Sequence, residues 1–124
     1  MTIKVLLSDK KAAKYRGLIL KNAQKLARFL RLDGYVEIYL VGNRQMKKNV
    51  LTYLALRGFP RPDLKQKPLG EIYLNPFFIK KSKEDLLFML THGFLHIAGY
   101  DHIKKNDRIM MEKKELQLFR KLKS

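Results

Sequence analysis

The sequence of 124 residues contains no cysteine. Disulfide bonds and thiolate metal sites are therefore excluded, and any bound metal must be held by histidine, aspartate or glutamate. The sequence also lacks a signal peptide and an apolar run long enough to span a bilayer, so we expect a cytoplasmic protein. Internal repeats, low-complexity segments and interdomain linkers are lacking too, which predicts a single domain over residues 1–124.

Acidic residues are scarce, because the chain has 27 Lys and Arg but only 11 Asp and Glu, a formal net charge of +16. Such an imbalance attracts polyanions, since neutralising phosphates releases the counterions condensed on them. Lysine-rich surfaces of heat-adapted proteins normally gain glutamate as well, and here the acids do not keep pace. With 46% apolar residues the chain is not disordered. We therefore expect a folded domain that binds nucleic acid in preference to an anionic membrane surface.

Hydrophobic periodicity and turn residues predict three strands and four helices. The strands are expected at Thr2–Leu7, Tyr35–Val41 and Glu71–Leu74. The helices are expected at Lys11–Leu32, Arg44–Leu56 and Ser82–Ala98, and from Asn106 or Asp107 to Leu122. The segment Arg57–Leu69 contains three prolines and should be irregular. This order predicts an α+β fold or an α/β sandwich, in which helices pack against a small mixed sheet.

Side-chain patterns also predict helix ends and core contacts. Gly42-Asn43 should form a turn and cap the second helix, and Asp85 should be the N3 residue of a capping box that begins at Ser82. The helix that ends near Ala98 is apolar nearly all round, so we expect it to be the buried central helix. The expected core contacts of the first and last helices are Ile19, Ala23, Leu26, Leu30, Met110, Leu118 and Leu122.

All three histidines of the chain lie between residues 92 and 102, in the spacing H-x-x-x-H-x-x-G-x-x-H. Residues four apart share one face of a helix, so His92 and His96 should direct two imidazoles at one point. Gly99 can end the helix because it tolerates a positive φ, and the turn it makes can return His102 to the same point. Three imidazoles with an open position form a catalytic zinc site, so we expect one Zn²⁺ ion here.

The same spacing occurs in zinc proteases, with one difference. Proteases place a glutamate directly after the first histidine as the general base, and this chain has Gly93 there. A peptidase mechanism therefore lacks its proton acceptor. Asp101, next to the third histidine, is a candidate substitute. An equally good interpretation is that Asp101 orients an imidazole through the free ring nitrogen.

The segment H-G-F-L-H-I-A-G-Y-D-H at residues 92–102 resembles the motif H-G-x-L-H-L-x-G-Y-D-H of the YbeY family of bacterial zinc-dependent endoribonucleases. Residues 69–72 resemble the L-G-D-I strand of that family, and Met111, Glu112 and Glu115 resemble its acidic C-terminal helix. The resemblance implies that His92, His96 and His102 are zinc ligands. It also implies hydrolysis of single-stranded RNA, in maturation of the 3′ end of small-subunit ribosomal RNA and in ribosome quality control, with ribosomal proteins as further partners.

The chain departs from the family between its second predicted helix and residue 69. Members usually carry Y-R-G and then T-D-V-L-S-F-P, whereas this sequence has Asn49–Tyr53 followed by Arg57-Gly58-Phe59-Pro60. Two interpretations are open: Arg57 represents the functional arginine of the family, or Phe59-Pro60 is the end of the family strand. The first makes Arg57 a catalytic candidate, and the second implies a strand that is missing or replaced.

Phosphodiester cleavage needs an activated nucleophile and stabilisation of charge on the phosphoryl oxygens. Our hypothesis is that zinc supplies the first, while Arg57 clamps the phosphate with its guanidinium fork. Other Lys and Arg side chains would hold the RNA backbone without reading its sequence. Two alternatives remain. One is a zinc metallopeptidase, and the other is a ribosome-binding protein in which the metal is structural.

Overall fold

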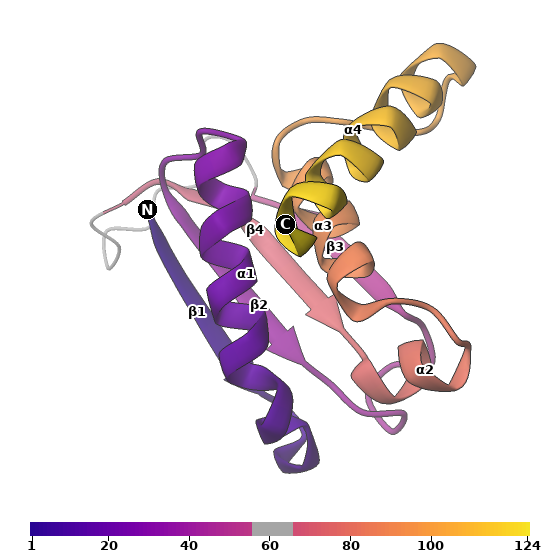
Figure 1. The fold of residues 1–124 in the computed structure, drawn as a ribbon. Coiled ribbons are helices and arrows are strands. Elements are labelled where there is room, and N and C mark those ends of the chain that lie inside the picture. Colours follow the sequence, from indigo (N-terminus) through magenta and orange to yellow (C-terminus); the bar gives the residue numbers. More distant parts are fainter. Residues whose placement is uncertain (56–65) are drawn as a thin grey trace.

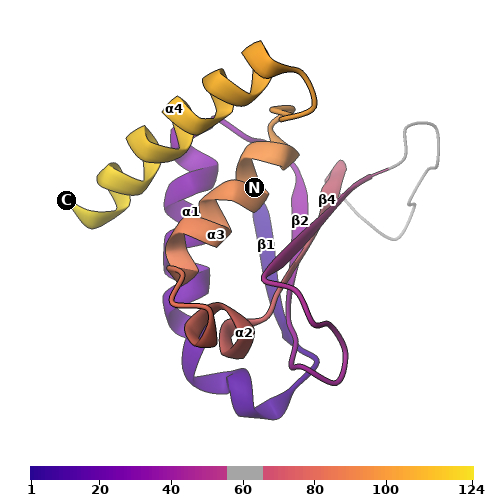
Figure 2. The same cartoon turned by 90° about the vertical axis from the view of Figure 1, so that its right-hand side faces the viewer.

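The computed structural model describes residues 1–55 and 66–124, which fold into a four-stranded sheet with helices on one face (Figures 1 and 2). The strands are β1 (Thr2–Leu7), β2 (Tyr35–Leu40), β3 (Val50–Leu54) and β4 (Pro68–Leu74). The helices are the 3₁₀ helix η1 (Lys10–Tyr15), α1 (Arg16–Phe29), α2 (Pro76–Lys81), α3 (Leu86–Ile97) and α4 (Lys105–Lys123). The strand order is β1-β2-β4-β3. The first two pairings are parallel and β3 is antiparallel to β4, so the predicted mixed sheet and α+β class are confirmed.

The helix-covered face of the sheet is the hydrophobic core. Val36, Ile38 and Leu40 alternate along β2 and are completely buried, as are Ile72 and Leu74 of β4. Period-two alternation places all five side chains on the same side of the sheet. Helices α1 and α3 contact the sheet there, and α4 packs on both helices. The core therefore fixes α3, the central helix that carries two of the histidines.

The predicted helix Arg44–Leu56 is wrong. Its first residues form a turn, in which the N–H groups of Gln45 and Met46 both donate to the carbonyl of Gly42. Its later residues form β3, whose sequence VLTYL is rich in β-branched and aromatic residues. Pairing with β4 satisfies the backbone groups on one side of β3, an interaction that helical periodicity within one segment cannot reveal. The segment Asn49–Tyr53, where the chain departs from the family, thus overlaps β3, and Arg57-Gly58-Phe59-Pro60 lies outside the described residues.

The boundaries of the next elements also differ from the prediction. β4 begins at Pro68, before the predicted Glu71, and Asn75 directly after it begins α2, because the Asn75 side chain accepts from Phe78 N–H. Ser82 lies at the C-terminus of α2, and Lys83 has a positive φ of 59° that separates α2 from α3. Asp85 is therefore the N-cap of α3 itself, accepting hydrogen bonds from Leu87 N–H and Phe88 N–H.

The long first helix is confirmed from Arg16 to Phe29, after an initial 3₁₀ segment, and ends three residues before the predicted Leu32. Its predicted core residues Ile19, Ala23 and Leu26 are completely buried, and Leu30 is half-buried. In α4 the predicted contacts of Leu118 and Leu122 are confirmed.

Two expectations for α4 are wrong. Met110 is 62% exposed, because the buried face of α4 consists of Met111, Glu115, Leu118 and Leu122 in i, i+4, i+7, i+11 spacing. Asn106 and Asp107 lie inside the helix, which begins after Lys104 without a side-chain cap. Across residues 1–55 and 66–124, the helices are too short or too polar to cross a membrane.

Candidate metal centre

His92 and His96 lie on one face of α3 and are half-buried, between the sheet and α4. The helix is held rigidly because Leu90, Phe94 and Leu95 on its other faces are completely buried. The four-residue spacing places the two imidazoles one turn apart, edge to face, with ring centroids separated by 4.7 Å.

The chain turns back immediately after α3. Gly99 N–H donates to the carbonyl of His96, and Tyr100 N–H donates to the carbonyl of Leu95, the two bonds of a Schellman motif. Gly99 adopts a φ of 101°, as its expected role in ending the helix requires. The turn returns the exposed His102 to the site, with its ring centroid 5.1 Å from that of His96 and 5.8 Å from that of His92.

The three histidines can offer their ring nitrogens to one ion. One nitrogen from each lies within 4.8 Å of the other two, and Nε2 of His92 is 3.1 Å from Nε2 of His96. Two ligand nitrogens on a tetrahedral zinc ion, each at about 2.0–2.1 Å, are about 3.3 Å apart. The observed spacing therefore fits a divalent ion of this size.

The second ring nitrogens of these histidines also favour a cation. His96 Nδ1 lies 3.1 Å from the carbonyl of Tyr100, which can only accept, so Nδ1 carries the proton. His92 Nδ1 lies 2.9 Å from Oε1 of the buried Glu115, and a carboxylate again requires the proton on Nδ1. Both Nε2 atoms then present lone pairs to each other. Such a pair repels unless a positive charge lies between the nitrogens, and His102 can offer a third nitrogen to a metal ion there.

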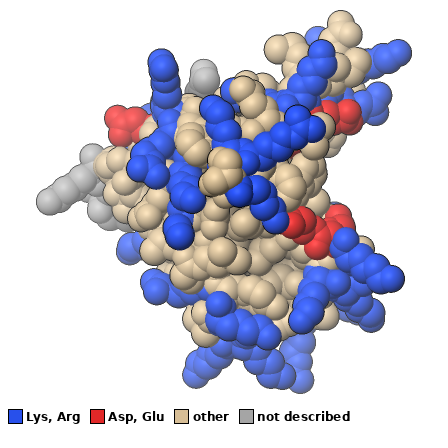
Figure 3. Space-filling view, in the orientation of Figure 1, with Lys and Arg blue, Asp and Glu red and all other residues tan. Residues whose placement is uncertain are grey.

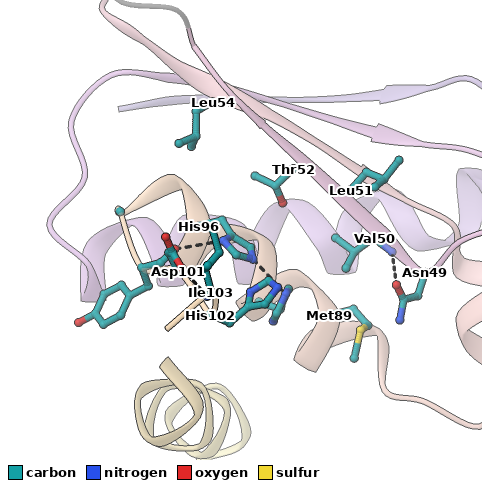
Figure 4. Close-up of a pocket in the computed structure, with 13 residues that line it drawn as sticks. Asn49, Val50, Leu51, Thr52, Leu54, Met89, His96, Asp101, His102 and Ile103 are labelled. Carbon is teal, nitrogen blue, oxygen red and sulfur yellow. Dashed lines mark hydrogen bonds between the residues drawn. The ribbon is translucent and has the colours of Figure 1, made fainter. Parts of the chain in front are cut away.

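The histidines open onto a groove of about 790 Å³. Figure 4 shows β3 along one side of it, with Thr52 facing His96, and the loop with Asp101 and Ile103 on the other side. β3 is an edge strand. The residues directly before and after it are hydrogen-bonded across the sheet, because the Asn49 carbonyl accepts from Asn75 N–H and Ala55 N–H donates to the Leu69 carbonyl. Because bonded pairs alternate in an antiparallel ladder, the N–H and C=O groups of Thr52 and Leu54 point away from β4.

The two predicted catalytic residues have different outcomes. Asp101 is exposed, lines the groove, and accepts a hydrogen bond on Oδ1 from Ile103 N–H at 2.6 Å. Since the Nδ1 atoms of His92 and His96 have other partners, an orienting role for Asp101 is limited to His102. Arg57 lies outside the described residues.

Glu115 is the contact that our prediction from sequence missed. It was noted only as part of an acidic helix, yet its side chain is 8% exposed and holds His92. The two residues are 23 positions apart, so no local motif joins them. The available signal was a carboxylate four residues after Met111 on the apolar face of α4.

The packing of α3 against β4 explains why position 93 is a glycine. A Cβ atom at this position would approach the Ile72 side chain at 3.0 Å, because α3 lies directly against β4 there. A glutamate after the first histidine, as in the proteases, would therefore meet the sheet and not the groove.

The apo protein should lose stability in acid through His96. Burial, and then the charge of His92, lower the pKa of His96 from its ordinary value of 6.5. Below pH 6.5 the unfolded chain binds a proton at this histidine that the folded protein resists. The free energy of unfolding is therefore fully present above pH 6.5 and decreases as the pH drops below it. In chelator, the melting temperature should fall as the pH drops below about 6.5, and His96→Asn should flatten the decline. An equal decline in both proteins would contradict this origin.

Comparisons with known proteins identify relatives of the chain. The family model Endoribonuclease YbeY matches residues 4–123. Endoribonuclease YbeY of Thermotoga maritima is 33% identical over 100 residues, covering 67% of this chain and 65% of that protein. The Lacticaseibacillus paracasei protein of the same name is 36% identical over 53 residues, covering 36% of this chain and 35% of that protein. The matches thus span less than two thirds of the length of these relatives.

A solved structure shares the fold. The solution structure of the protein TM1509 from Thermotoga maritima has a TM-score of 0.58 and 21% sequence identity to this chain. The similarity covers 98% of this chain and 89% of that one. The described arrangement of sheet and helices is therefore one that a known protein adopts nearly throughout.

Proposed function

Because the chain belongs to the endoribonuclease YbeY family, we propose that it is a zinc-dependent endoribonuclease that cleaves single-stranded RNA. The observation that carries the proposal is the 3.1 Å approach of His92 Nε2 to His96 Nε2, with a third histidine beside them at the mouth of a groove. The net charge of +16 supports an RNA substrate. The substrate we propose is ribosomal RNA, at the 3′ end of the small-subunit molecule, in ribosome maturation and quality control in the cytoplasm, with ribosomal proteins as further partners.

The residues that would hold one zinc ion are His92, His96 and His102. The chemistry that zinc supplies when bound is the polarisation of a phosphoryl oxygen and the activation of a water molecule. Glu115 and the carbonyl of Tyr100 fix the protons on the two Nδ1 atoms, which directs both Nε2 lone pairs at the common centre.

Proton transfer and phosphate binding fall to other residues. Asp101 is our candidate proton acceptor, because it lines the groove next to His102 and its Oδ1 is anchored by Ile103 N–H. Arg57 remains a candidate phosphate clamp, outside the described residues. The backbone N–H groups of Thr52 and Leu54 face away from the sheet and supply neutral donors for the RNA strand.

The two alternative functions are less well supported. A peptidase would need a general base after the first histidine, whereas a side chain at position 93 would contact Ile72 on β4 and be directed away from the groove. A purely structural metal is normally enclosed by four protein ligands, whereas these three histidines border an open groove.

A substrate assay separates the nuclease from its alternatives. The protein should cleave single-stranded RNA and leave denatured casein intact, and a chelator should stop RNA cleavage until zinc is restored. Cleavage products are resolved on denaturing gels. Proteolysis without RNA cleavage would establish the peptidase, and no cleavage of either substrate with zinc present would favour the structural metal.

A further inference from the structure

We propose that α1 and α4 carry a second RNA-binding surface, separate from the histidine groove, which docks structured RNA by its phosphates. We name it the basic ridge and define it by five side chains: Lys21, Lys25 and Arg28 of α1, and Lys114 and Lys121 of α4. The inference rests on the proposed function, because it describes how the RNA substrate is held outside the cleavage site.

The α1 part of the ridge is a single stripe. Lys21, Lys25 and Arg28 follow i, i+4, i+7 spacing, away from the buried face formed by Ile19, Ala23 and Leu26. At 1.5 Å per residue the stripe is about 10 Å long. A nucleic-acid strand presents several phosphates over such a length.

The α4 part lies beside it. Lys114 and Lys121 are seven residues apart, hence on one face of α4, and the Nζ atom of Lys121 lies 5.2 Å from the centre of the Phe29 ring of α1. This contact brings Lys121 beside the C-terminal end of the α1 stripe, and Lys114 continues the positive charge along α4. In Figure 3, Lys and Arg side chains gather over α1 and the C-terminal end of α4. Lys123 is not included, because it pairs with Asp85.

The ridge is not neutralised by the protein. No Asp or Glu occurs between residues 10 and 32, and the five cations form no ion pair with a carboxylate in the described part of the chain. Like charges at i, i+3 and i, i+4 on a helix repel and destabilise it. A bound polyanion removes that repulsion. On the opposite face of the sheet, by contrast, Lys4, Glu37 and Glu71 lie in one row of paired residues, with both signs of charge.

The shape of the ridge indicates structured RNA. The ridge lies on the outer surface of α1 and α4, while the groove lies between α3 and β3. A short single strand bound in the groove would therefore not contact the ridge. Lys and Arg side chains on such a surface contact phosphates, which positions the RNA without reading its bases. An anionic membrane is the weaker partner, because amphipathic helices bind membranes by inserting an apolar face, and that of α1 is buried in the core.

Binding measurements with substituted ridge residues test the proposal. The variant carries Lys21→Gln, Lys25→Gln and Arg28→Gln, and the matched control carries Lys80→Gln, Lys81→Gln and Lys83→Gln. The probe is an RNA hairpin with a single-stranded 3′ tail, titrated in chelator at several salt concentrations so that no cleavage occurs. The ridge variant should bind it at least about 10-fold more weakly, with the slope of log K against log salt reduced by about 2–3. The affinity of the control variant for the hairpin should differ from that of the wild type by less than about twofold. The affinity of the ridge variant for the isolated single-stranded tail should also change by less than about twofold.

Three results would overturn the ridge. They are unchanged binding by the ridge variant, equal weakening in both variants, or wild-type binding to phosphatidylserine vesicles as tight as to the hairpin. The proposed function fails separately, because this measurement needs no cleavage. If the ridge variant loses binding while the wild type with zinc cleaves no RNA, the ridge stands and the nuclease does not.

Discussion

Replacing His102 by alanine should reduce RNA cleavage at least about 100-fold and remove the metal, while the protein remains folded. His102 is exposed, and its imidazole forms no hydrogen bond with another residue in 1–55 or 66–124. Its loss therefore costs the fold little, unlike that of His92, which would leave the buried Glu115 without its partner. The measurements are cleavage of single-stranded RNA, the metal-to-protein ratio by elemental analysis, and the far-ultraviolet circular dichroism spectrum.

The adjacent residue provides the control for this substitution. Ile103 is 86% exposed and also lines the groove, so Ile103→Ala changes the same loop without removing a nitrogen ligand. It should keep a full complement of metal. If His102→Ala retained its metal and cleaved RNA at the wild-type rate, coordination by three histidines would be wrong.

Replacing Glu115 by glutamine should weaken zinc binding about 10–100-fold, as is typical for groups that orient metal-binding histidines. The Glu115 carboxylate accepts from His92 Nδ1 at 2.9 Å and is only 8% exposed. Glutamine keeps the size and one acceptor oxygen, but it removes the negative charge that raises the basicity of the ring. Zinc affinity is measured by competition with a chromophoric chelator. Saturating zinc should restore cleavage in Glu115→Gln, which it cannot do in His102→Ala.

A matched variant distinguishes this role from a structural one. Glu112 is exposed and lies one turn earlier on α4, so Glu112→Gln makes the same charge change on the same helix. It should leave zinc affinity unchanged. If Glu115→Gln lowered only the melting temperature of the zinc-free protein, without a change in zinc affinity, Glu115 would be a structural residue.

Features that depend on neighbouring residues could be predicted from the sequence. The range of β1, the core residues of α1 and the positive φ of Gly99 follow from local periodicity and backbone sterics. The placement of His92 and His96 on one face follows from helical spacing alone.

Features that depend on residues distant in the sequence could not be predicted. Strand β3 forms because β4 lies beside it, and Glu115 reaches His92 because α4 crosses α3. The assignment of Met110 to the core was wrong by a single residue, since the phase of α4 is set by where the helix packs. These errors share one cause, which is that tertiary contacts decide between local alternatives of similar energy.

The orientation of β3 has a consequence for how the protein tolerates mutation. The wall of the groove that β3 forms ends in an edge of peptide backbone, because the N–H and C=O groups of Thr52 and Leu54 point away from β4. Replacing a side chain leaves those groups in place, apart from proline, which removes a donor. The side chains along this wall can thus be substituted during evolution, while the pattern of backbone donors and acceptors offered to an RNA strand stays constant.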